Sequence, residues 1–185
     1  PWLEIPIDVE AETVRNIEFR VPSPEGTLRP LGEGNPIRAG QGAHRGAWWM
    51  LGVIDGVQGD VARSIVQDDS GYLWFGTQGG LHRYDGTQIL HYNKSDGLLS
   101  QAITGLVLTK DGSLWIGSNA GLSRLQGDSL TNYTTLDGLI DNEIQVLLEA
   151  QDGSLWVGTN GGISHYVDGQ FFNYTAMDGL GNNTV

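Results

Sequence analysis

Short polar side chains return at a fixed interval in this sequence, in two sets of loop positions. All are Ser, Asn, Asp or Gln, which are residue types that can hydrogen-bond the hydroxyl groups of a sugar or another polar ligand. The candidate ligand-binding residues are Gln78, Asn119 and Asn160 in the first set, and Ser100, Gln101, Asp141, Asn142, Asn182 and Asn183 in the second. A structural role is the alternative, because Asn and Asp also recur where a loop needs a left-handed backbone or an Asx-turn.

Patterns for catalysis and metal binding are weaker. Asp96, Asp137 and Asp178 recur in Asp-Gly-Leu segments, and paired carboxylates can act as general acid and base. We assign these residues to turns, because equivalent residues of successive repeats belong to different structural units. Four histidines lack the spacing of a metal site and are expected at the surface or at sheet edges: His44, His82, His91 and His165. The sequence thus predicts no catalytic residue, no metal site and no cofactor.

The interval that governs these positions is 41 residues. Trp74, Trp115 and Trp156 keep it, as do the three Asp-Gly-Leu segments. One supersecondary unit is therefore copied along the chain. Periods of about 40 to 50 residues occur both in β-propeller blades and in helical arrays, so the pattern inside the unit must decide.

That pattern favours strands. Short runs rich in Leu, Ile, Val, Trp, Tyr and Phe are separated by Asp-Gly, Gly-Gly or Gly-Asp, which are turn dipeptides. In the second unit, we expect strands at residues 102–109, 113–118, 122–126 and 129–134. Four antiparallel strands per copy make a propeller blade. The predicted fold class is all-β, a partial β-propeller of three four-stranded antiparallel blades with the start of a fourth.

The repeat frame extends from about residue 48 to residue 185. Blades are expected at about 58–98, 99–139 and 140–180. Residues 22–47 contain four of the six prolines and are interpreted as a linker, and residues 1–21 as the tail of a preceding β domain. In the alternative, this region supplies an edge strand that helps to close the propeller. Three blades cannot close a ring of the usual four to eight, so further blades of a longer protein are expected as partners.

Two columns of residues are assigned to structure. Each tryptophan of the repeat is large enough to fill the space between neighbouring sheets, and the glycine two residues later permits close approach of the backbone. The structural residues are Trp74, Trp115, Trp156, Gly76, Gly117 and Gly158.

Composition excludes several classes of function. The 22 acidic against 10 basic residues give a formal charge of −12, which disfavours binding to nucleic acid or to an anionic membrane surface. The chain has no cysteine, which rules out disulfides and thiol chemistry. No apolar run is long enough to span a membrane. Because the chain starts at Pro1 without a leader, we interpret it as an excised or processed piece.

The sequence of the first blade resembles a known repeat family. The segment DDSGYLWFGTQGGLHRYDGTQILHYNKSDGL strongly resembles the two-component regulator propeller repeat, with matches that include Gly71, Leu73, Trp74, Gly76, Thr77, Gly80, Leu81, Arg83, Tyr84, Asp85 and Gly86. Ser118, Gln126 and His165 depart from the repeat pattern. His165 stands where the other blades have Arg83 and Arg124, which weakens any common function for that column.

The resemblance implies a seven-bladed propeller in the extracytoplasmic, periplasmic sensor region of a bacterial hybrid histidine kinase or a related receptor. The expected function is to sense a ligand, of which carbohydrate is one class, and to pass a signal to an output domain outside this chain. A homodimer is a further expected partner. The alternatives are a protein-interaction scaffold and a glycan-binding or glycan-processing propeller. Neither nucleic acid nor direct membrane contact is expected, and the segment itself is not expected to be an enzyme.

Overall fold

The computed structural model describes residues 27–38, 43–45, 48–50, 56–59 and 61–185. The expectation for residues 1–21, and that for the His44 side chain, lie outside this description. Among the described residues, no helix is both long and apolar enough to cross a membrane.

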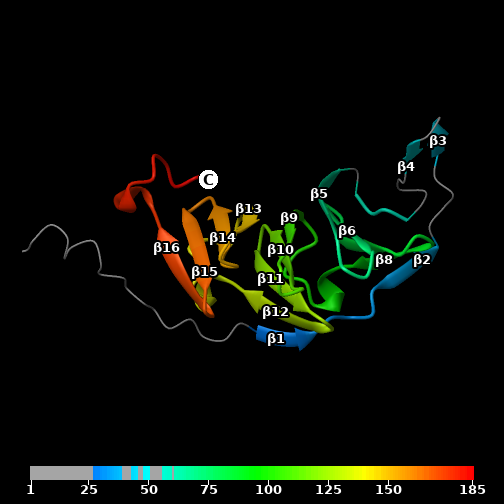
Figure 1. Cartoon of the computed structure of the whole chain (residues 1–185), viewed down its shortest axis with the longest axis horizontal. Coiled ribbons are helices and arrows are strands. Elements are labelled where there is room, and N and C mark those ends of the chain that lie inside the picture. Colours follow the sequence, from blue (N-terminus) through cyan, green and yellow to red (C-terminus); the bar gives the residue numbers. More distant parts are fainter. Residues whose placement is uncertain (1–26, 39–42, 46–47, 51–55, 60) are drawn as a thin grey trace, which may run out of the picture.

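Three twisted antiparallel sheets stand side by side, each built from four consecutive strands (Figure 1). The first contains β5 (Ala62–Gln67), β6 (Leu73–Thr77), β7 (Leu81–Tyr84) and β8 (Gln88–Tyr92). The second contains β9 (Ile103–Leu108), β10 (Leu114–Ser118), β11 (Gly121–Gln126) and β12 (Ser129–Tyr133). The third contains β13 (Ile144–Glu149), β14 (Leu155–Thr159), β15 (Ile163–Val167) and β16 (Gln170–Tyr174). This arrangement confirms the predicted all-β propeller fold class, and we call the sheets blades one, two and three.

In blades two and three, the hairpin between the first two strands turns at Asp-Gly. In blade two, the Gly112 N–H donates to the Thr109 carbonyl at 2.8 Å, and Gly112 has a φ of 80°. That left-handed backbone conformation strains residues that carry a Cβ atom. The Asp111-Gly112 pair therefore specifies the turn between the first two strands of blade two.

Neighbouring blades pack through glycine. A Cβ atom on Gly76 would lie 2.4 Å from a methyl carbon of Ile103 in blade two, and one on Gly117 would lie 2.8 Å from Ile144 in blade three. A Cβ atom on Gly158 would lie 2.6 Å from Val146 of its own blade and 3.1 Å from Val185, whose N–H donates to the Thr159 carbonyl. Ile103 and Ile144, the first residues of β9 and β13, therefore each pack a β-branched side chain against the glycine of the preceding blade.

The tryptophans differ in burial along the array. Trp74 and Trp115 are 6% and 3% exposed, and each lies at a junction between two described blades. Trp156 is only partly buried, in the last blade. Leu148 and Tyr174 of this blade are exposed as well.

The segment interpreted as a linker contains strands. β1 (Thr27–Pro30) pairs antiparallel with β12, and β2 (Asn35–Arg38) pairs antiparallel with β8. Both lie along the outer edges of the blades (Figure 1). Within the segment interpreted as a linker, residues 27–30 and 35–38 thus form strands at the edges of blades two and one. Blades one and two also have five strands instead of the expected four, because the edge of an outermost strand can pair with any extended segment.

The remaining described elements are short. β3 (Ala43–Arg45) and β4 (Trp48–Met50) form a separate hairpin. Three single-turn 3₁₀ helices follow the outer strands, at η3 (Lys94–Asp96), η4 (Thr135–Asp137) and η5 (Ala176–Asp178). They begin the connections that lead from one blade to the next.

Candidate functional site

Every blade has two ends that could meet a ligand. At one end lie the loop between its second and third strands and the linker that leads into the blade; we call this the loop end. At the other end lie the two hairpin turns, before the second strand and after the third; we call this the turn end. The nine predicted ligand-binding residues all belong to the loop end.

Six of those nine residues are held by hydrogen bonds within the chain. Asn142 Oδ1 accepts the Thr135 N–H at 2.8 Å, and Asn183 Oδ1 accepts the Ala176 N–H at 2.6 Å. These bonds tie each linker to the 3₁₀ turn before it. Four more make local contacts: Ser100 and Asp141 accept backbone N–H groups of their own linkers, Asn182 accepts the Thr184 N–H, and Asn160 bonds Gln145 and Glu143. Their first role is structural.

The other three candidates keep their polar groups available. Gln78, Gln101 and Asn119 are exposed, and no hydrogen bond joins their side chains to any part of the chain that the structure describes. They come from the loop of blade one, the linker into blade two and the loop of blade two. The structure does not bring all nine residues together in one site.

The Asp-Gly-Leu aspartates lie in turns. Asp137 Oδ2 accepts the Thr134 N–H at 2.8 Å, and Asp96 and Asp178 close equivalent capping boxes on their own 3₁₀ turns. A carboxylate that accepts N–H groups stabilises the first turn of a helix. The repeat of these residues thus reflects the linker, as the sequence indicated, and their distribution over three turns provides no acid–base pair.

At the turn end, each blade places a cation or an imidazole on its tryptophan. The Arg124 guanidinium lies 5.3 Å from the Trp115 ring centre, and Arg83 lies 4.7 Å from that of Tyr72 and 5.5 Å from that of Trp74. His165 stacks on Trp156 at 4.0 Å. Such contacts stabilise by about 0.5–1 kcal/mol at exposed sites. The column therefore supports the tryptophans, with an imidazole replacing the cation in blade three.

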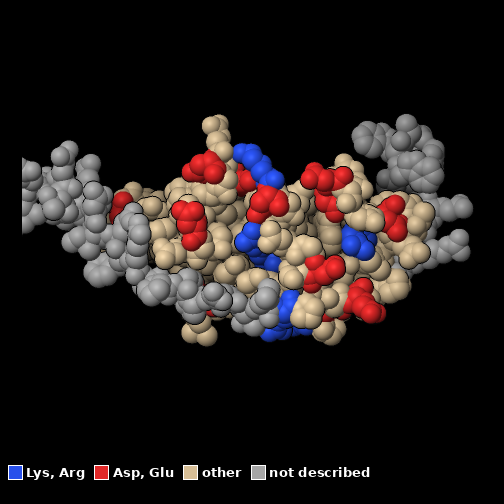
Figure 2. Space-filling view, turned by 60° about the horizontal axis from the view of Figure 1, so that its bottom comes forward, with Lys and Arg blue, Asp and Glu red and all other residues tan. Residues whose placement is uncertain are grey.

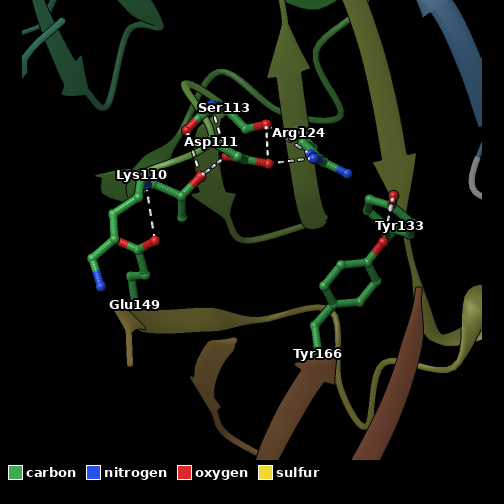
Figure 3. A network of polar contacts seen from close by, with 8 residues as sticks. Lys110, Asp111, Ser113, Arg124, Tyr133, Glu149 and Tyr166 are labelled. Atoms are coloured by element: carbon green, nitrogen blue, oxygen red, sulfur yellow. Dashed lines mark hydrogen bonds and ion pairs between the residues drawn. The ribbon is translucent and has the colours of Figure 1, made fainter. Parts of the chain in front are cut away.

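Blade two adds an ion pair to this contact (Figure 3). Arg124 Nη2 lies 2.7 Å from Asp111 Oδ2, and Asp111 also accepts hydrogen bonds from Thr109 and Ser113. Partial burial opposes ionisation of Asp111, but these hydrogen bonds and the Arg124 charge outweigh it and lower its pKa to about 2. The aspartate of the turn dipeptide therefore also anchors the cation above Trp115.

Clefts open at the turn end between neighbouring blades. The cleft between blades two and three has a volume of about 330 Å3, and the one between blades one and two has about 290 Å3. In the former, Lys110 Nζ donates to the Gln151 carbonyl, and the Lys110 backbone N–H donates to Glu149. The hydroxyl of Tyr166, which lines this cleft, lies 3.4 Å from that of Tyr133 (Figure 3). Burial raises the pKa of Tyr133, and the Tyr166 hydroxyl raises it further.

Sequence reasoning missed these clefts. The available signal was the arginine that follows each of the first two tryptophans by nine residues. In the cleft between blades two and three, Lys110 bonds Glu149 and Gln151 across the blade junction, so a ligand there would compete with bonds that join two blades. Figure 2 shows acidic side chains spread over one face of the molecule, with fewer basic ones between them.

One histidine expected at the surface is buried. His82 is 0% exposed, and its Nε2 accepts the Gln58 N–H at 2.9 Å. Its position on β7 faces the next strand of its own blade, where His91 lies with ring centres 4.8 Å apart. Burial, followed by the His91 charge, lowers the pKa of His82 to about 4. Among the described residues, no group of three or more His, Asp or Glu side chains could hold a metal ion.

Known proteins share this repeat and this fold. The profile of the family described as "Two component regulator propeller" matches residues 56–79, 97–120 and 138–161. A comparison with curated proteins gave no match. Among solved structures, the extracellular domain of a proposed hybrid two component system, BT3049 of B. thetaiotaomicron, has 28% sequence identity and a TM-score of 0.59, over 64% of this chain and 17% of that one.

Two further structures share the fold alone. The extracellular domain of BT4673, from the same organism, has 19% identity and a TM-score of 0.55, over 88% of this chain and 23% of that one. Virginiamycin B lyase from Staphylococcus aureus has 17% identity and a TM-score of 0.50, over 61% of this chain and 40% of that one. This chain therefore spans less than a quarter of the two B. thetaiotaomicron domains.

The repeat frame, the three matched segments and the shared fold of the extracellular domains lead to one conclusion. The chain belongs to the two component regulator propeller family.

Proposed function

We propose that this chain is a ligand-sensing propeller segment of a bacterial signalling receptor and lies on the extracytoplasmic side of the membrane. The observation that carries the proposal is the family repeat, present in three copies in frame, together with the 28% identity to an extracellular domain of a hybrid two component system. Binding at the propeller would be passed to an output domain such as a histidine kinase.

The loop end is the better candidate for the ligand. Gln78, Gln101 and Asn119 present amide groups to solvent there, whereas Lys110 in the cleft between blades two and three already bonds the neighbouring blade. Amides donate and accept at once, which suits the hydroxyl groups of a carbohydrate. We therefore propose an oligosaccharide as the ligand class, bound without turnover.

The binding test uses the whole extracellular region of the receptor that contains this chain. Titration calorimetry against a panel of oligosaccharides should give saturable heat for at least one of them. Asn119→Ala should then weaken binding by about tenfold, the worth of one well-placed polar contact. Gln126→Ala is the matched control, because Gln126 is exposed at the turn end of the same blade. Equal losses in both variants, or no binding by any glycan, would contradict the proposed site and ligand.

The signalling half of the proposal has its own test. The gene that encodes this chain should also encode a membrane-spanning helix and a signalling module. A product that instead carries a secretion or surface-attachment module would favour the alternatives, a protein-interaction scaffold or a glycan-binding propeller.

A further inference from the structure

The clefts at the two described blade junctions differ in what crosses them. In the cleft between blades two and three, Lys110 bonds Glu149 and Gln151 of the neighbouring blade. The positions 41 residues earlier hold Asp69, Leu108 and Lys110. Within the described part of the chain, no hydrogen bond or ion pair joins Asp69 to either of the other two. The cleft between blades one and two is therefore not bridged in this way.

The two clefts also differ in the partners of their arginine. Arg124 Nη2 lies 2.7 Å from Asp111 Oδ2 (Figure 3). Arg83 is the equivalent residue of blade one, but Ser70 stands at the position of Asp111. The Arg83 guanidinium lies against two aromatic rings of its own blade, and no described residue gives it a hydrogen bond or an ion pair. A guanidinium with free N–H donors can bind a carboxylate through two parallel hydrogen bonds.

Three carboxylates line the same cleft, and their hydrogen bonding differs. Asp68 accepts two backbone N–H groups of its own turn and the indole N–H of Trp74. The carboxylates of Asp69 and Asp128 accept no hydrogen bond from the described residues, although both line the cleft. The cleft thus combines one unpaired cation with two unpaired carboxylates.

The remaining wall of this cleft is apolar. Leu108, Leu114 and Leu125 of blade two line it, and Leu125 stands where the other cleft has Tyr166. Its volume of about 290 Å3 lies at the small end of the range for sites that bind small molecules, about 300–1,000 Å3. The ligand that fits is therefore small and partly apolar.

We propose that the cleft between blades one and two binds a small zwitterion, a free amino acid or a short peptide. Its carboxylate binds Arg83, its ammonium group lies on the side formed by Asp69 and Asp128, and its apolar part packs on the leucines. A simple anion would be repelled by the two carboxylates, and a simple cation by Arg83, whereas a zwitterion complements both charges. This site lies at the turn end and is separate from the oligosaccharide site proposed at the loop end.

Titration calorimetry on the whole extracellular region of the receptor tests the ligand class. The probes are L-leucine and the dipeptide L-leucyl-L-leucine, of which at least one should give saturable heat at concentrations up to about 10 mM. L-leucinamide lacks the carboxylate and N-acetyl-L-leucine lacks the ammonium group, so each should bind at least about tenfold more weakly than L-leucine. No saturable heat from either zwitterion, or equal binding of the blocked forms, would overturn the proposal.

Variants of the arginine and its surroundings test the place of binding. Ser70→Asp gives Arg83 the partner that Arg124 has in blade two, and it should weaken zwitterion binding by about tenfold or more, as should Arg83→Gln. Arg124→Gln is the matched control, because the same residue type is removed from the neighbouring cleft. Equal losses in Arg83→Gln and Arg124→Gln would contradict the site. Oligosaccharide binding should be unchanged in Ser70→Asp, so failure of this site is distinguishable from failure of the loop-end site.

A double variant tests the acidic side of the cleft. Asp69→Asn with Asp128→Asn should weaken the binding of L-leucine by about tenfold, because the ammonium group loses its charged partners. The same variant should strengthen the binding of N-acetyl-L-leucine, because the repulsion of its carboxylate is removed. Parallel losses for both probes would contradict a contact between the ammonium group and these carboxylates.

Discussion

Blade one and blade two hold their incoming linkers with different side chains. In blade two, Ser123 Oγ donates to Asn132 Oδ1 at 2.6 Å, and Asn132 Nδ2 donates to the Gly97 carbonyl of the incoming linker at 3.0 Å. Blade three repeats this with Ser164 and Asn173. In blade one, His82 and His91 occupy the two positions, 41 residues earlier.

The difference makes one blade sensitive to pH. The amide and hydroxyl of blade two carry no charge at any physiological pH, whereas His82 accepts the Gln58 N–H only when Nε2 is unprotonated. Its proton must then lie on Nδ1, which has no hydrogen-bond partner among the described residues. His82 thus holds Gln58, in the segment that leads into blade one, only in its neutral form.

The largest expected effect of this contrast is a loss of folding stability as the pH is lowered. Below the ordinary histidine pKa of 6.5, His82 binds a proton in the unfolded chain, whereas folded His82 stays neutral until about pH 4. The unfolded state therefore gains protons as pH falls through this window, and the free energy of unfolding should drop by about 3 kcal/mol. Urea denaturation at a series of pH values measures it.

The matched variant for this experiment replaces His82 and His91 with the residues of blade two. His82→Ser with His91→Asn should remove much of the pH dependence between 6.5 and 4. Identical slopes in the variant and the original chain would show that carboxylates cause the loss of stability.

The close contact between a glycine and the next blade, which blades one and two share, should give the next largest effect on stability when it is disturbed. Gly76→Ala would bring a Cβ within 2.4 Å of Ile103, and overpacking of this kind costs about 2 kcal/mol. Gly105→Ala is the control, because its Cβ would meet nothing closer than Leu147 at 3.9 Å. Thermal unfolding of both variants decides the matter: similar melting temperatures would exclude a tight junction at Gly76.

Removing the blade-two amide should cost less. Asn132 is 3% exposed, so Asn132→Ala should lower the free energy of unfolding by about 1–2 kcal/mol through lost hydrogen bonds. In that background, Ser123→Ala should have little further effect, because its acceptor is already gone. Additive losses in the double variant would show that the two residues act independently.

The ion pair of blade two should have the smallest effect. Because the Asp111 side chain is 49% exposed, Asp111→Asn should cost less than about 1 kcal/mol. Its folded pKa of about 2 lies below the ordinary aspartate value of 3.8, so its contribution is present above pH 3.8 and lost as pH falls toward 2. Chemical denaturation should therefore show a larger difference between variant and original chain at pH 7 than at pH 2.5.

Much of the fold could be predicted because the repeat shows each strand three times. The four strands of blade two lie within one residue of the expected ends, since turn dipeptides and apolar runs are local signals. The pairing of residues 27–38 with the blade edges could not be predicted in this way. β1 and β2 are four residues long and contain prolines, and their pairing depends on blade edges far along the chain.

The candidate site was harder to predict for a related reason. Asn142 and Gln101 occupy equivalent positions, yet Asn142 bonds the preceding turn and Gln101 remains exposed. A polar loop residue has the same sequence signature in both roles. His82 was misplaced because its burial depends on the histidine of the neighbouring strand.

The pairing of β1 with β12 also has a consequence for synthesis on the ribosome. Thr27 is made about 100 residues before its partner Asn132, and chains grow during synthesis at about 5–20 residues per second. The N-terminal segment therefore leaves the ribosome several seconds before the edge that receives it exists. An early-made segment with glycine, proline and charge at its exposed positions is protected against premature pairing while it waits.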